Sequence, residues 1–198
     1  MTSKKINIDK LSLIMLEKLN DSNDLDAVLM DSLKVLKIDI KSFKKIKETY
    51  YRNGLGSLMT QINIVINKML KKDNPIDVNK FRISEKIIFY VFKRLKIIDK
   101  LCNRKKLFFI MMKPQNFSIS NKILFKIADE IWFLAGDKST DMNYYSKRII
   151  LMNIYASIFS FFVFDQSKDF SRTLNLLEKE INLVLSFGKI KKKISSFF

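Results

Sequence analysis

The most informative stretch of the sequence is residues 129–148, which reads DEIWFLAGDKSTDMNYYSKR. Apolar residues precede Gly136, and a long apolar run follows Arg148. Gly136 suits the left-handed position that ends a helix. After it come four side chains that accept hydrogen bonds from free N–H groups at a helix start: Asp137, Ser139, Thr140 and Asp141. The local prediction is a helix, a tight Gly-Asp turn and a second, capped helix.

The composition favours an all-α fold. The chain has 198 residues, of which 47% are apolar, enough for one domain or for two lobes that share a core. Only two Pro and four Gly are present, which leaves little turn chemistry for a β fold. Long stretches of Lys, Leu, Ile, Glu and Phe between these rare residues indicate helices.

The spacing of apolar residues orders these helices along the chain. Three short helices before residue 50 are compatible with a helix-turn-helix lobe. The residue before Pro75 disfavours helix, so a lobe boundary is expected there. We predict an N-terminal lobe with a connecting helix over 1–72, a helical ligand-binding lobe over 76–188, and a basic, aromatic tail over 189–198. Further expected helices cover 58–70, 81–101, 104–112, a segment from Ser118 or Ser120 to Trp132, 144–164, and 170–187 with its end at Gly188.

The helix over 144–164 is the most apolar. From Ile149 to Phe164 only Asn153, Ser157 and Ser160 are polar. This run of sixteen residues is shorter than the ~20 residues that a helix needs to cross a bilayer, so we expect a helix buried on most sides. The three polar side chains share a stripe, which indicates hydrogen bonds to the preceding turn, a dimer mate or the head of a bound lipid.

The net charge of +17 has two interpretations. It indicates a nucleic-acid or anionic-membrane partner, or it reflects an AT-rich genome that enriches Lys, Asn and Ile together. The lysines of 41–47 can contact phosphates, but no Arg, Gln or Asn lies between Ile38 and Lys47 to read base edges. We therefore expect a solvated lysine face and no specific nucleic acid.

The C-terminal tail combines a basic cluster with terminal aromatics, which suits an anionic membrane surface or a solvated chain end. The expected membrane contacts are Lys191, Lys192, Lys193, Phe197 and Phe198. Neither a secretory signal nor an Arg-rich transit peptide is seen, and the single Cys102 forms no disulfide within the chain. We expect a bacterial cytoplasmic protein at the periphery of the inner membrane, or a mitochondrial-matrix one if the source is eukaryotic.

Most catalytic chemistry is missing from the sequence. It has no His, one Cys and no Gly-rich phosphate loop. This removes Ser-His and Cys-His nucleophile pairs, most metal sites and nucleotide motifs. We expect no enzyme activity, no metal and no cofactor.

The string W-x-x-A-G-D-x-S-T-D-x-N-Y-Y-x-K-R, from Trp132 to Arg148, resembles the central signature of the Coq-nine family, accessory proteins of ubiquinone (coenzyme Q) biosynthesis. The similarity covers roughly residues 50–188, including YYRNG at 50–54, Pro114, Asp165, Thr173 and FG at 187–188. The resemblance implies a TetR-like fold without DNA binding, a pocket for an isoprenoid lipid, and work beside a ubiquinone hydroxylase.

The resemblance also implies site residues. It places Asp129, Trp132 and Leu134 on the surface that faces the hydroxylase, although a Trp at such a position is commonly a core residue. We expect an elongated apolar pocket between 81–101 and 144–164, a homodimer, and a TetR-type transcription regulator as the alternative function. The expected lipid contacts are Ile87, Val91, Leu95, Tyr144, Arg148, Tyr155 and Phe159, with a salt bridge as the other role for Arg148.

Overall fold

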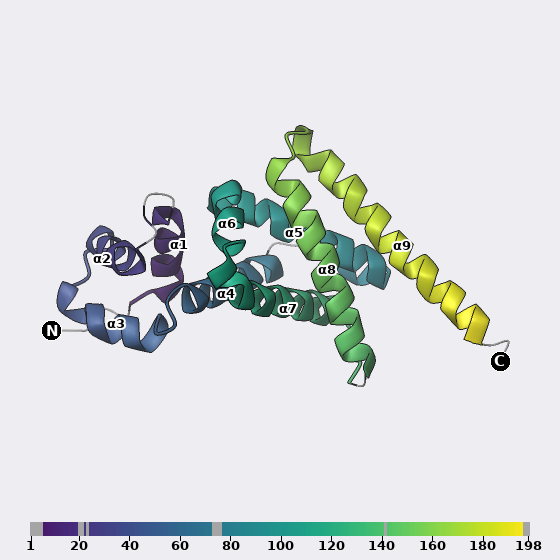
Figure 1. Cartoon of the computed structure of the whole chain (residues 1–198), viewed down its shortest axis with the longest axis horizontal. Coiled ribbons are helices and arrows are strands. Elements are labelled where there is room, and N and C mark those ends of the chain that lie inside the picture. Colours follow the sequence, from purple (N-terminus) through teal and green to yellow (C-terminus); the bar gives the residue numbers. More distant parts are fainter. Residues whose placement is uncertain (1–5, 20–21, 23, 73–76, 141, 196–198) are drawn as a thin grey trace. The chain divides into compact units, whose positions relative to one another are not determined.

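The computed structural model describes residues 6–19, 22, 24–72, 77–140 and 142–195, with side chains up to Val184 except Asn79. Over these residues the chain forms α-helices and short 3-10 helices without a strand (Figure 1). The predicted all-α class is confirmed. The TetR-like arrangement stays a prediction.

The chain divides into two compact units. Unit 1 comprises Met1–Lys72 and Ile97–Ile123, and unit 2 comprises Asp73–Lys96 and Leu124–Phe198. One division falls after Lys72, close to Pro75, and residues 97–123, which the sequence analysis assigned to the ligand-binding lobe, group with unit 1. The limits of 97–123 fall inside two helices, where no Pro or Gly marks them. The predicted lobes 1–72 and 76–188 and the tail 189–198 stay predictions.

Unit 1 is built around α1 (Ile8–Lys18), which packs on both α2 (Leu25–Val35) and α4 (Leu55–Lys71). Helices α1 and α2 begin at side-chain caps: Asn7 accepts the N–H of Lys10, and Asp24 accepts those of Asp26 and Ala27. The 3-10 helix η1 (Ile40–Ser42) leads into α3 (Phe43–Tyr50), so the three predicted N-terminal helices are present. Leu11, Leu33 and Leu58 are fully buried between these helices.

The turn before α4 requires a glycine. Gly54 has φ +55°, and a Cβ placed there would lie 3.4 Å from Leu25 Cδ1. The positive φ disfavours any larger residue, whereas the contact with Leu25 would be an ordinary van der Waals one. The remaining helix of unit 1, α6 (Arg104–Met111), is followed by η3 (Pro114–Asn116).

Unit 2 contains η2 (Val78–Lys80), the first part of α5 (Ile83–Leu101), the last part of α7 (Phe117–Leu134), α8 (Met142–Phe164), η4 (Lys168–Phe170) and α9 (Ser171–Ser195). Helices α8 and α9 pack together as a hairpin (Figure 1). Asp165 fixes their turn, since it accepts the N–H groups of Ser167 at 2.8 Å and Thr173 at 3.0 Å. Burial opposes ionisation of Asp165, but bonds from Thr173 and Ser167 outweigh it and lower its pKa to about 2.

Two predicted helix limits are wrong. Helix α7 begins at Phe117, and Ser120 does not cap it: its hydroxyl donates to the carbonyls of Met111 and Asn116. Helix α9 runs through Gly188 to Ser195. A glycine ends a helix only where it adopts a left-handed conformation; otherwise it costs about 1 kcal/mol relative to Ala and the helix continues.

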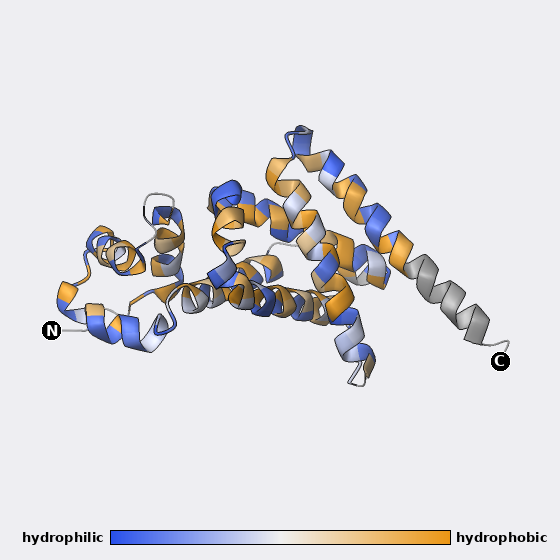
Figure 2. Ribbon diagram, in the orientation of Figure 1, coloured by the Kyte–Doolittle hydropathy of each residue, from blue (hydrophilic) through white to orange (hydrophobic). Residues whose placement is uncertain are grey.

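Helix α8 is longer and more exposed than predicted. It has 23 residues, so by length and composition it is able to cross a membrane, a test that core helices of soluble proteins also pass. The prediction counted only the sixteen residues of the apolar run from Ile149 to Phe164, whereas the helix itself begins at Met142, two residues before its predicted start. Only 39% of its most apolar 18 residues are buried. Hydrophobic residues recur along it (Figure 2), and Ile149, Ile150, Phe161 and Phe164 are exposed.

The polar stripe of α8 is also accounted for in part. Ser160 donates to the carbonyl of Ala156, which is the predicted bond to the preceding turn. Ser157 donates to Glu180 of α9 at 2.8 Å, so it joins the two helices of the hairpin.

Candidate functional site

The turn between α7 and α8 has the predicted left-handed glycine. Gly136 has φ +89°. Its N–H donates to the carbonyl of Phe133 at 3.0 Å, and the N–H of Asp137 donates to that of Trp132 at 3.0 Å. This pair of bonds is a Schellman ending, which satisfies carbonyl groups that a helix end leaves open.

Asp137 was expected to cap the following helix, and that prediction is wrong. Helix α8 begins only at Met142, too far along the chain for Asp137 to be its N-cap. The Asp137 carboxylate instead accepts hydrogen bonds from Lys147 Nζ at 2.7 Å, Arg148 Nη1 at 2.9 Å and Ser139 Oγ at 2.7 Å. Asp141, the other expected cap, lies outside the described residues.

Arg148 joins a second carboxylate to the same cluster. Its Nε donates to Asp129 Oδ1 at 2.6 Å, and the Tyr144 hydroxyl donates to that oxygen at 2.8 Å. The guanidinium also stands 3.4 Å from the centre of the Tyr144 ring, a cation–π contact. Arg148 therefore has the salt-bridge role that was its alternative, and Asp129 is held from within the chain.

Trp132 closes the cluster on the α7 side. It is half-buried, and its indole N–H donates to the carbonyl of Lys147 at 3.0 Å. Lys147 Nζ lies 5.3 Å from the centre of the indole ring. Leu134 is also half-buried, and Phe133 between them is 66% exposed. We call the cluster the α7–α8 clasp: Asp129, Trp132, Asp137, Ser139, Tyr144, Lys147 and Arg148.

Charge pairing within the clasp fixes its ionisation. Burial opposes the ionised form of Asp137, but bonds from Lys147, Ser139 and Arg148 hold its pKa well below the usual range. Burial also opposes the charge of Arg148, yet Asp129 and Asp137 raise its pKa. The hydrogen bond to Asp129 raises the pKa of Tyr144. These groups keep their protonation states near neutral pH, so the clasp holds two helices together and is unsuited to proton transfer.

The expected lipid contacts on α5 and α8 lie in the interior of unit 2. Ile87, Val91, Leu95 and Tyr155 are buried, and Phe159 is half-buried with its ring stacked on Tyr155. Burial fits a packed core as well as a pocket wall, so their lipid role stays a prediction. Tyr144 and Arg148 belong to the clasp.

Sequence analysis missed one residue of this interior. Arg94, on α5, is only 2% exposed and interacts with Tyr155 of α8 and with Glu130 of α7. Burial lowers its pKa, and these two neighbours oppose that effect. The sequence holds part of the signal, because Arg94 stands three residues after Val91 on the apolar stripe of α5, but spacing alone does not show that a charged residue there is buried.

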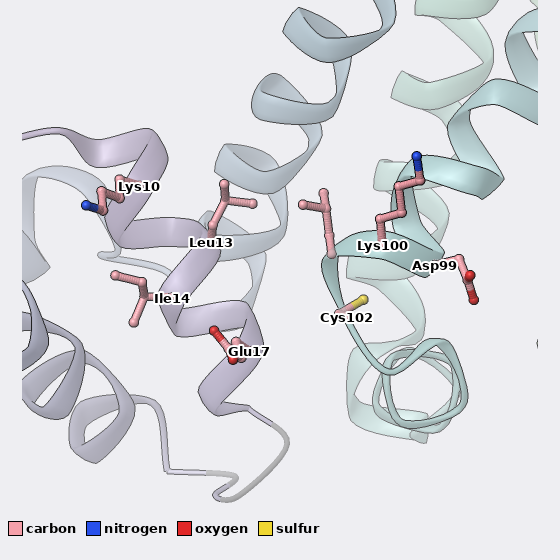
Figure 3. A pocket seen from close by; sticks show the side chains of 8 residues that line it. Lys10, Leu13, Ile14, Glu17, Asp99, Lys100 and Cys102 are labelled. Atoms are coloured by element: carbon pink, nitrogen blue, oxygen red, sulfur yellow. The ribbon is translucent and has the colours of Figure 1, made fainter.

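A separate cavity of about 490 Å³ lies in unit 1, between α1 and the C-terminal end of α5 (Figure 3). Burial raises the pKa of the Cys102 thiol to about 12, so this side chain is protonated and a poor nucleophile. Among the side chains that the structure describes, no three His, Cys, Asp or Glu residues are grouped to hold a metal. The cavity is lined by Lys10, Leu13, Ile14, Glu17, Asp99, Lys100, Leu101 and Cys102.

These features define an all-α protein with an apolar interior in unit 2, whose most distinctive polar cluster joins two helices. The family model described as COQ9 matches residues 117–188, which include α7, α8 and the whole clasp. The predicted resemblance to this family is confirmed, and residues 117–188 are the part of the chain that its model matches.

Curated proteins of the same name are also similar to this chain in sequence. "Ubiquinone biosynthesis protein COQ9, mitochondrial" of Rattus norvegicus is 29% identical over 143 residues, 70% of this chain and 46% of that protein. The Homo sapiens protein of the same name is 36% identical over 87 residues, 44% of this chain and 27% of that one. A "Probable ubiquinone biosynthesis protein coq9, mitochondrial" of Dictyostelium discoideum is 30% identical over 112 residues, 56% and 36% of the two chains. The chain thus spans less than half the length of these relatives.

Proposed function

We propose that this protein is an accessory protein of ubiquinone biosynthesis, which binds a polyprenylated quinone intermediate and presents it to a partner hydroxylase. The observation that carries the proposal is the match of the COQ9 family model to residues 117–188, because these residues include the whole α7–α8 clasp with Trp132. The relatives that match are named ubiquinone biosynthesis proteins. The hydroxylase supplies the oxidation, and this chain acts without catalysis.

The apolar interior of unit 2 supports the lipid part of the proposal. A long isoprenoid tail is costly to expose to water, so carrying it requires a substitute apolar environment. Helices α5 and α8 offer Ile87, Val91, Leu95 and Tyr155, all buried, with Phe159 beside them. The ligand is the isoprenoid quinone itself, and the proposal needs no cofactor.

The end of α7 supports the partner part. Trp132 is half-buried beside the exposed Phe133, and Trp is enriched among residues that dominate interface energetics. Internal contacts fix the Trp132 ring, so little ordering remains to be done on docking. Asp129 contributes by holding Arg148, and Leu134 adds apolar surface.

We place the protein where ubiquinone is made, as a homodimer at a membrane surface. The mitochondrial names of the relatives support the matrix, and the bacterial cytoplasm is the other compartment that we predicted. The expected membrane contacts Lys191, Lys192, Lys193, Phe197 and Phe198 lie outside the described side chains. The regulator alternative is less favoured, because the relatives that match are named ubiquinone biosynthesis proteins.

Two measurements test the proposal. Lipids extracted from the purified protein and identified by mass spectrometry should include an isoprenoid quinone or its precursor, in about one copy per chain or per dimer. A pull-down with the ubiquinone hydroxylase should succeed for the wild type and fail for Trp132→Ala at a temperature well below the melting temperatures of both proteins, where the variant is folded. The proposal would be contradicted if the extracts contained only bulk phospholipid. It would also be contradicted if the protein bound one DNA operator tightly at physiological salt.

A further inference from the structure

One corner of unit 1 exposes three large apolar side chains. Phe109, Met112 and Phe117 are 57%, 58% and 62% exposed, and they lie within nine residues of sequence. Single exposed apolar residues are ordinary on protein surfaces, whereas a group of them marks a contact surface.

Hydrogen bonds hold this corner in shape. Asn116 Nδ2 donates to the carbonyl of Ile110 at 2.7 Å, and Ser120 Oγ donates to that of Met111 at 2.6 Å. The first turn of α7 is thereby fixed against the last turn of α6. Phe109 and Met112, three residues apart, share one face at the end of α6. Phe117 opens α7 directly after η3, so all three belong to one turn region.

The corner is also strongly basic. No acidic residue occurs between Asp99 and Asp129. Lys105 and Lys122 are exposed, and Lys106 and Lys113 are half-buried; Arg104 is paired with Asp99. We call this surface the α6 corner: Lys105, Lys106, Phe109, Met112, Lys113 and Phe117.

We propose that the α6 corner binds an anionic lipid surface, with its three apolar side chains inserted at the boundary between head groups and acyl chains. Lysines attract anionic head groups, and exposed Phe and Met side chains partition into the acyl boundary. Long lysine stems can lie along the apolar surface while their ammonium groups reach the phosphates.

A nucleic acid explains less of the surface. Phosphates would account for the lysines, but duplex recognition gives no role to a projecting Phe109, Met112 and Phe117. Single-stranded nucleic acid stacks on aromatic rings and would leave Met112 without a function. A lipid surface accounts for both the charges and the apolar groups.

The α6 corner comprises other residues than the basic tail at 189–198, and the proposal does not depend on the quinone-carrying function. Vesicle binding can be positive while lipid co-purification is negative, and the reverse also holds. Failure of one proposal is therefore distinguishable from failure of the other.

The test is vesicle flotation with the full chain. The vesicles contain phosphatidylcholine and phosphatidylglycerol at a ratio of about 70:30, with pure phosphatidylcholine for comparison. The variant is Phe109→Ser/Met112→Ser/Phe117→Ser. Its matched control, Val35→Ser/Ile40→Ser/Ile64→Ser, removes three other exposed apolar side chains of unit 1. A third variant, Lys191→Ser/Lys192→Ser/Lys193→Ser, reports on the tail.

We expect the wild type to float with the anionic vesicles and to be released as salt rises. The corner variant should bind about tenfold or more weakly, and the matched control within about twofold of wild type. A polarity-sensitive dye on Met112→Cys, in a Cys102→Ser background, should shift to the blue on binding, and the same dye on Val35→Cys should not.

Three results would overturn the proposal. The first is a wild type that binds no anionic vesicle. The second is a corner variant that floats like the wild type, whether or not the tail variant is released. The third is a single-stranded oligonucleotide that displaces the vesicles and binds the corner variant and the wild type equally, because the basic surface would then serve nucleic acid.

Discussion

Replacing Arg148 with Met tests whether the α7–α8 clasp holds the two helices together. Met keeps the aliphatic volume of Arg148 but removes its bonds to Asp129 at 2.6 Å and Asp137 at 2.9 Å. Removing one partner of a fully buried pair costs about 3–5 kcal/mol. Two features lower that figure here: Asp129 is 44% exposed, and Asp137 keeps Lys147 and Ser139.

We therefore expect Arg148→Met to lower the free energy of unfolding by about 2–3 kcal/mol. At about 2–4 °C per kcal/mol for a chain of this size, the melting temperature should fall by about 4–12 °C. The matched control is Lys34→Met, which breaks the exposed Lys34–Asp31 pair and should cost at most about 0.5 kcal/mol. Both variants are compared by thermal and urea unfolding.

A double-mutant cycle decides whether the loss comes from the ion pair. Asp137→Asn alone should destabilise the fold, and Asp137→Asn with Arg148→Met should cost less than the sum of the two, with a coupling of at least about 1 kcal/mol. Additive losses would show that Arg148 acts through packing and that its ion pair with Asp137 does not hold the two helices together.

Three further predictions concern Trp132, the interior of unit 2 and pH. Trp132→Ala should lower the free energy of unfolding by less than the about 3–5 kcal/mol expected of a core Trp, because the Trp132 side chain is half-buried. It should weaken hydroxylase binding by about 2 kcal/mol or more. A large drop in melting temperature with a proportionate loss of binding would contradict this prediction. Val91→Phe adds volume at a fully buried position. If a lipid pocket lies there, the free energy of unfolding should change by no more than about 1 kcal/mol while the amount of bound lipid decreases. If the region is a packed core, the substitution should lower the free energy of unfolding by about 1–3 kcal/mol. Asp165 has a folded pKa of about 2, lower than its unfolded value, so its contribution of about 2 kcal/mol should be complete above about pH 4 and lost as pH falls toward 2. The Thr173 hydroxyl donates to Asp165 Oδ2 at 2.5 Å, so Thr173→Val, which removes it, should weaken this pH dependence in urea titrations at stepped pH.

The sequence predicted the helices well and the clasp only in part. Gly136 was identified because a left-handed position after an apolar run has few other occupants. The pairing of Asp137 with Lys147 and Arg148 was missed, because Asp137 also matches the local pattern of a helix cap and only the start of α8 at Met142 excludes that role.

Other features depended on tertiary packing. Arg94 was overlooked because a charged residue is expected to face solvent, and its burial arises only when Tyr155 and Glu130 from other helices approach it. The exposure of Ile149 and Phe164 was missed for the converse reason, since apolar content alone does not show which faces of α8 are covered. The α6 corner likewise required the exposures of Phe109, Met112 and Phe117, which periodicity does not give.

The position of Trp132 gives the protein a built-in optical probe. It is the only Trp of the chain, so ultraviolet excitation near its absorption edge reports on the α7–α8 clasp alone. The indole N–H is bonded to the carbonyl of Lys147, and the ammonium group of Lys147 stands near the ring. Both contacts influence the emission energy of an indole, so a shift in emission wavelength would report loosening of the clasp. Docking of a partner on the exposed side of the ring would instead protect the indole from a soluble quencher. Clasp opening and complex formation are thereby separable in a cuvette without a label.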